Sequence, residues 1–257
     1  MGISRLVNSS SNLVEKSYNR KLPFLIEGEL FVFPRKVIKI SRGIENGKGG
    51  EFMRFQTINT LQKENNSITD LFERYSEPIY KGHSIRVAKY MAAMRSALTA
   101  AGDYRLNMYT ERDVAVAGML HDIGKALLPH DLLAKDGPLD NAEIRLMQSH
   151  PVMGAKIIES HPLEHDVHRE LLMDTIKCHH ERWDGMGYPE GLKEEGIPLI
   201  ARLCAIADTY DAVVSDRPYR KGVEAAIALN ELRKAAGTQL DPYLVRCLLE
   251  KPDWMRI

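Results

Sequence analysis

The chain has 257 residues, of which 44% are hydrophobic and 27% charged, and its formal net charge is zero. This composition excludes a mainly disordered chain, and the lack of a basic excess argues against a protein that coats nucleic acid polymers or anionic membranes. The three cysteines are widely spaced and odd in number, which argues against a secreted disulfide scaffold. The same cysteine pattern predicts a cytoplasmic protein, and no apolar run approaches the roughly 18 residues of a membrane span.

Residues 1–66 are expected to form a small N-terminal segment that contains β structure. Residues 22–60 are rich in β-branched and aromatic side chains, and the stretch between the apolar runs holds four glycines and an Asn-Gly pair, which favour turns. About 40 residues of this kind are too few for an independent core. Residues 1–60 also carry a net charge of +5 against −5 for the rest of the chain. We therefore expect the segment to pack on the remaining chain or to mediate self-association into a homodimer.

From residue 67 to residue 257 the pattern is helical, and we expect a mainly α fold with one large helical domain. Thr110, Asp140 or Asn141, and Pro242 stand where helix N-caps and first turns prefer such residues. On one expected helix Val87, Met91, Met94 and Leu98 recur at the spacing of a buried face. Helices are expected at 67–80, 85–102, 110–125, 139–160, 169–183, 197–216, 222–237 and 241–250.

All nine histidines lie between His83 and His180, and this clustering points to chemistry. Any one of them alone is more often an ordinary core or surface residue than a ligand. Together they form a regular pattern. The successive intervals along the series His83, His121, His150, His179 and Asp208 are 38, 29, 29 and 29 residues, and each interval fits one helix plus a connection. Neighbouring helices of a bundle can thus offer ligands to one point in its interior.

Asp122 follows His121 directly, and His180 follows His179. With these two residues the candidate set contains five imidazoles and two carboxylates. That is too many ligands for one ion, and an aspartate can bridge two, so Asp122 is expected to be shared by two metals. Nitrogen and oxygen ligands without thiolates suit Fe or Mn, with Ni, Co or Zn tolerated.

The motifs resemble those of the HD-GYP domain, a branch of the HD metal-dependent phosphohydrolases, over roughly residues 70–250. They are GHSxR at 82–86, MLHDIGK at 119–125, KDGPLD at 135–140, HPxxGA at 150–155, HHERWDGMGYP at 179–189, IPLIARLCAIADTYDA at 197–212 and SDRPYRK at 215–221. The resemblance implies an HD-superfamily helical bundle that hydrolyses cyclic di-GMP to linear pGpG, with GMP as a further product to test.

By position, the resemblance assigns the metal ligands to His83, His121, Asp122, His150, His179, His180 and Asp208. Some members carry a third metal on a glutamate four residues before the first histidine; Ile79 stands there, which favours two ions. Asp122 and Lys125 are the expected catalytic residues, and Lys125 resembles a phosphate-contacting lysine. Arg217 and Arg220 resemble residues that grip phosphates or guanines.

Two assignments leave alternatives open. Asp211 lies three residues after Asp208 on the same helix face, where it can bind or orient substrate, accept a proton, or only support a ligand. In the family the loop with Gly187, Tyr188 and Pro189 is also a surface proposed to meet diguanylate cyclases. Two other functions compete with the first: a phosphodiesterase for another cyclic dinucleotide such as cyclic GMP-AMP, and a non-catalytic sensor or adaptor.

Overall fold

The computed structural model describes residues 24–26, 29–31, 71–73, 78–163, 168–215 and 222–255. This part of the chain is mainly helical, as expected. Near its start, β1 (Phe24–Ile26) and β2 (Glu29–Phe31) pair antiparallel, with Phe24 opposite Phe31 and Ile26 opposite Glu29. The rest of the expected N-terminal segment lies outside the described residues, so its β character and its boundary at residue 66 stay predictions.

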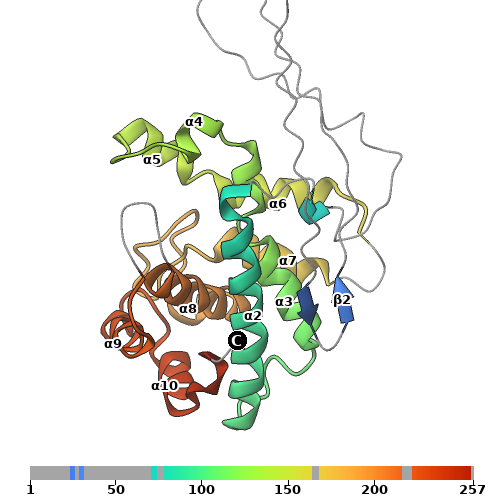
Figure 1. Cartoon of the computed structure of the whole chain (residues 1–257), viewed down its shortest axis with the longest axis vertical. Helices are drawn as coiled ribbons and strands as arrows, with labels where there is room; N and C mark the ends of the chain where they lie inside the picture. Colours follow the sequence, from blue (N-terminus) through green and yellow to red (C-terminus); the bar gives the residue numbers. More distant parts are fainter. Residues whose placement is uncertain are drawn as a thin grey trace, which may run out of the picture.

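The longest described helix, α2 (Pro78–Ala100), runs through the middle of the helical body in Figure 1. It packs against α3 (Glu111–Leu120), α8 (Leu199–Val214) and α10 (Pro242–Glu250). The predicted apolar face of α2 is buried, since Val87, Met91 and Met94 have no exposed surface. α7 (Arg169–Cys178) packs on α3 and α8, and α9 (Ala225–Ala235) packs on α8 and α10.

Several predicted helix ends are confirmed. Thr110 caps α3, and its side chain exchanges hydrogen bonds with Asp113 in a capping box. Asp140 caps α5 (Asn141–Met147) and Asp241 caps α10 by accepting backbone N–H bonds, and Pro242 is the first residue of α10. These polar caps satisfy N–H groups that have no partner inside the helix.

The single helix predicted for residues 139–160 is wrong, because the structure has two helices there. α5 (Asn141–Met147) ends before α6 (His150–Ser160) begins, and Pro151 is the second residue of α6. Proline has no N–H to donate and its ring clashes with the preceding turn inside a helix, so Pro151 fits the first turn of a new helix and the break falls just ahead of that turn. α4 (His130–Leu133), which the sequence pattern did not predict, precedes α5.

The predicted helix at 110–125 also ends early, at Leu120, and a short 3₁₀ helix, η1 (Ile123–Leu127), follows. η1 lies against α6. The contact is so close that a Cβ atom on Gly124 would overlap the carbonyl oxygen of His150, and one on Gly154 would lie 3.1 Å from the backbone nitrogen of Gly124. These glycines therefore bring His121 and Asp122 next to the first residue of α6.

We predict that Gly124→Ala lowers the free energy of unfolding by about 1–3 kcal/mol, because overpacking a close contact costs that much. Urea unfolding followed by circular dichroism measures it. Gly196→Ala is the control, since nothing lies within 4 Å of a Cβ at that position. Equal stability of the two variants would contradict the close contact.

Within the described ranges, no helix is long and apolar enough to cross a membrane. The three cysteines are buried and free.

Candidate metal centre

The seven predicted ligands come from different elements of the bundle and lie near one another. α2 carries His83 and α8 carries Asp208, while the ends of three shorter helices carry the rest. His121 and Asp122 follow the last residue of α3, His150 is the first residue of α6, and His179 and His180 follow the last residue of α7. The helix ends thus bring side chains that are far apart in sequence to one place.

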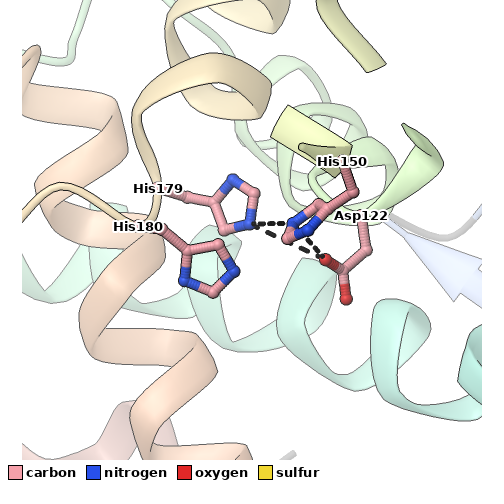
Figure 2. A group of neighbouring side chains, drawn as sticks. All are labelled: Asp122, His150, His179 and His180. Atoms are coloured by element: carbon pink, nitrogen blue, oxygen red, sulfur yellow. Dashed lines mark hydrogen bonds and ion pairs between the residues drawn. The ribbon is translucent and has the colours of Figure 1, made fainter. Parts of the chain in front are cut away.

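Asp122 belongs to two groups, in each of which the ligand atoms lie within 4.8 Å of one another. The first group contains Asp122, His150, His179 and His180, and Figure 2 shows these side chains converging. The second contains His83, His121 and Asp122. Asp122 Oδ1 lies 3.2 Å from His150 Nε2, whereas its Oδ2 lies 3.3 Å from His121 Nε2. The two oxygens of one buried carboxylate therefore face two different groups of imidazoles.

Three of the imidazoles are oriented by backbone carbonyls three residues before them. The Nδ1–H of His121 donates to the Gly118 carbonyl at 2.7 Å. The same bond joins His150 to Met147 at 2.8 Å and His179 to Ile176 at 2.9 Å. Because a carbonyl oxygen can only accept, Nδ1 carries the hydrogen and Nε2 is left with a lone pair.

These lone pairs point at other acceptors. His150 Nε2 and His179 Nε2 lie 3.3 Å apart, and neither has a hydrogen for the other when the imidazoles are neutral. His121 Nε2 and Asp122 Oδ1 are buried and have no hydrogen-bond partner among the residues that the structure describes. Facing acceptors of this kind are stabilised by a cation between them, so the donor set fits a metal ion.

Burial keeps two of the ligands neutral. It lowers the pKa of His179 to about 4 against the opposing effect of Asp122, and it holds the pKa of His180 well below its ordinary value. Burial alone would raise the pKa of Asp122, but Lys125, His121 and His150 together more than offset this, and the pKa lies well below the usual range. At neutral pH His179 and His180 are therefore neutral and Asp122 is ionised, the forms that bind metals.

His83 is oriented differently, by the carboxylate of Asp211 at 2.7 Å from its Nδ1. Its Nε2 lies 3.2 Å from Asp208 Oδ1 and 3.9 Å from Asp122 Oδ2. Burial disfavours the imidazolium, yet Asp208 and Asp211 raise the pKa of His83 to about 9. Neither group of close ligand atoms includes Asp208. Its contact with His83 places it beside the second group.

Lys125 lies at the edge of the same centre. Its Nζ is 2.5 Å from Asp122 Oδ2 and 4.6 Å from the centre of the Tyr80 ring. Burial would lower the pKa of Lys125, but Asp122 raises it above its ordinary value. The lysine is therefore a fixed cation beside the shared carboxylate.

The loop with Gly187, Tyr188 and Pro189 contacts the centre as well. The Tyr188 ring stacks on the His180 ring, with centroids 4.8 Å apart and planes 24° apart. A Cβ on Gly187 would lie 2.6 Å from the His180 carbonyl oxygen, so only glycine fits this close approach. The buried Glu181 accepts the backbone N–H of Glu190 at 2.7 Å and ties the loop back to the end of α7.

Two predicted residues, Arg217 and Arg220, lie outside the described part of the chain. The sequence reasoning also missed Arg86 and Tyr80. Arg86 donates from Nε and Nη2 to the Asp211 carboxylate at 2.6 and 3.0 Å. The sequence signal for Arg86 was its place in the GHSxR motif, three residues after His83 on the same face of α2; no role was assigned to it.

A family model described as HD domain matches residues 67–244, most of the chain. The chain belongs to the HD domain family. This confirms the family that the motifs indicated. The solved structure titled Bd1817, a HDG"Y"P protein from Bdellovibrio bacteriovorus, is similar to this HD domain with a TM-score of 0.50. The two are 20% identical, and the match covers 66% of this chain and 51% of that one, which supports the fold alone.

Curated relatives of this HD domain carry the names of phosphodiesterases. A Pseudomonas aeruginosa protein named cyclic di-GMP phosphodiesterase PA4108 is 39% identical over 168 residues, 65% of this chain and 38% of the relative. A Vibrio cholerae protein named 3'3'-cGAMP-specific phosphodiesterase 2 is 33% identical over 205 residues, 73% of this chain and 37% of the relative. The chain spans well under half the length of either relative.

Proposed function

We propose that the chain is a metal-dependent phosphodiesterase that hydrolyses cyclic di-GMP to pGpG. The observation that carries the proposal is the buried Asp122 carboxylate, whose two oxygens face two separate groups of imidazoles. Such a shared aspartate suits a pair of cations, and paired cations are common in enzymes that cleave phosphate esters. The names of the curated relatives point to a cyclic dinucleotide as the substrate.

In this proposal one ion is held by Asp122 with His150, His179 and His180, and the other by Asp122 with His83, His121 and Asp208. The nitrogen and oxygen donors favour Fe or Mn over Ni, Co or Zn. When bound, the ions supply Lewis-acid chemistry, since they lower the pKa of water and neutralise charge on the phosphodiester. In the reaction water adds to phosphorus, the bond from phosphorus to the ribose 3′ oxygen breaks, and that oxygen takes up a proton.

The chain's own residues orient and neutralise the substrate. Lys125 lies beside Asp122, where its ammonium can meet a phosphate oxygen during attack. Asp211 orients His83 through Nδ1, which favours a supporting role over direct substrate contact. Arg217 and Arg220 are proposed to grip the phosphates or guanines, as the resemblance implies.

Arg217→Ala is expected to raise KM for cyclic di-GMP about tenfold to a hundredfold, because a charge-assisted contact contributes roughly 1.5–3 kcal/mol. Arg220→Ala should behave alike. Neither arginine is a proposed ligand, so metal content should equal that of the wild type. Steady-state kinetics with elemental analysis tests this, and two variants with wild-type KM and kcat would refute the assigned roles.

Cyclic GMP-AMP is the second candidate substrate, because relatives at 32–34% identity carry names specific for it. Rates of the purified Mn²⁺- or Fe²⁺-loaded protein on cyclic di-GMP, 3'3'-cyclic GMP-AMP and cyclic di-AMP separate the candidates. The proposal expects the highest kcat/KM on cyclic di-GMP. Preference for cyclic GMP-AMP would establish the second candidate, and tight binding without cleavage of any of them would establish a sensor or adaptor.

The remaining proposals concern the parts of the chain around the centre. We propose that residues 1–66 form a separate β-containing segment that packs on the HD domain of residues 67–257 or joins two chains in a homodimer. The opposite net charges of residues 1–60 and the remainder support contact between them.

The loop with Gly187, Tyr188 and Pro189 is proposed to meet diguanylate cyclases, and Met186 beside it is 79% exposed. A cytoplasmic location remains part of the proposal.

A further inference from the structure

His83, in the second group of ligands, is anchored less directly than three of the other imidazoles. His121, His150 and His179 are each oriented by a backbone carbonyl of their own chain segment. His83 is oriented by a side chain, the carboxylate of Asp211 at 2.7 Å. A carbonyl within a helical turn stays in place with the backbone, whereas a carboxylate can rotate unless something holds it.

Arg86 holds that carboxylate. Its Nε donates to Asp211 Oδ1 at 2.6 Å and its Nη2 to Oδ2 at 3.0 Å, and the Ser215 hydroxyl adds a bond to Oδ1 at 3.1 Å. Asp211 is 1% exposed, so it has almost no water to replace a lost partner. A guanidinium grips both oxygens of a carboxylate in one plane, which fixes its rotation as well as its charge.

The pairing follows from the spacing on two facing helices. α2 presents His83 and Arg86 three residues apart, and α8 presents Asp208 and Asp211 three residues apart. Because residues three apart share a helix face, each pair lies on the side where α2 meets α8. His83 contacts both aspartates, and Arg86 contacts the second.

We infer that Arg86 is a positioning residue, which acts through Asp211 to aim His83 Nε2 at the metal centre. The two metal positions are then unequal. The position at His150, His179 and His180 does not depend on Arg86, whereas the position at His83, His121 and Asp208 does. This inference rests on the two-ion site of the proposed function.

The test is to titrate metal-stripped protein with Mn²⁺ alone and to measure the binding by calorimetry. The wild type should bind two ions. Arg86→Met should bind one ion with wild-type affinity and the other about 10–100-fold more weakly, the usual cost of losing a group that orients a ligand. Arg86→Lys keeps the charge without the planar fork, and it should weaken the same ion by a smaller factor.

Arg105 provides a matched control. It donates from Nε and Nη2 to Asp103 at 2.9 and 2.7 Å, and its side chain is 42% exposed, as is that of Arg86. The side chains of Asp103 and Asp211 are also both buried, with 4% and 1% of their surface exposed. Arg105→Met should therefore remove a comparable ion pair and leave both Mn²⁺ affinities unchanged.

A double variant shows whether Arg86 acts through His83. If it does, the double variant His83→Ala/Arg86→Met should bind Mn²⁺ with the same affinities as the single variant His83→Ala. Additive losses in the double variant, or two wild-type affinities in Arg86→Met and Arg86→Lys, would overturn the inference. Wild-type protein that binds fewer than two ions would instead contradict the proposed two-ion site.

Discussion

Asp122→Asn is expected to remove most of the bound metal and to abolish hydrolysis. The carboxylate contacts both imidazole groups, at 3.2 Å on Oδ1 and 3.3 Å on Oδ2, so its loss affects both ions at once. The fall in kcat should exceed the roughly 10–100-fold that follows loss of a group that only supports a ligand. Elemental analysis and steady-state kinetics on cyclic di-GMP measure the two effects.

Asparagine is preferred over alanine because it keeps the shape of the side chain and an oxygen that can accept from Lys125. Removing one partner of a buried pair outright typically costs about 3–5 kcal/mol, which could unfold the protein and hide the effect. Thermal unfolding of the metal-free proteins serves as the control for the fold. Two ions retained at wild-type affinity in Asp122→Asn would show that Asp122 is not the shared ligand.

Lys125→Met is expected to lower kcat about tenfold to a hundredfold and to leave KM and metal content close to wild type. Methionine keeps an unbranched stem for the Tyr80 ring, which Lys125 Nζ approaches to 4.6 Å, but removes the charge. A charge that meets the phosphodiester mainly as negative charge develops acts on turnover more than on binding.

The same variant separates two roles of the lysine. If Lys125 serves chiefly to hold Asp122 in place, metal affinity should fall together with kcat. Unchanged kcat with unchanged metal content would exclude both a catalytic and a positioning role.

Much of the centre could be predicted from the sequence because its ligands repeat at nearly equal intervals of a helix plus a connection. The structure indeed brings His83, His121, Asp122, His150, His179 and His180 into two adjoining groups. The helical pattern likewise predicted the buried face of α2, the cap of α3 and the first-turn proline of α10. The buried face and the helix ends depend on residues close in sequence, so local pattern is enough to find them.

What the sequence missed depends on contacts between distant segments or on exact backbone breaks. Arg86 pairs with Asp211, 125 residues away, and nothing in the local pattern marks that partner. The break before His150 depends on Pro151, which a reading by hydrophobic period passes over. α3 ends at Leu120, five residues before the predicted end, and the Gly118 carbonyl in its last turn accepts from His121.

Cleavage of cyclic di-GMP by the wild-type protein, first stripped of metal and then supplied with Mn²⁺, tests the central claim most directly. Chromatography of the products should show no cleavage before Mn²⁺ is added and formation of linear pGpG after two ions per chain have bound. Cleavage that persists in the metal-free protein, or no cleavage of any cyclic dinucleotide by protein with two ions bound, would contradict the account.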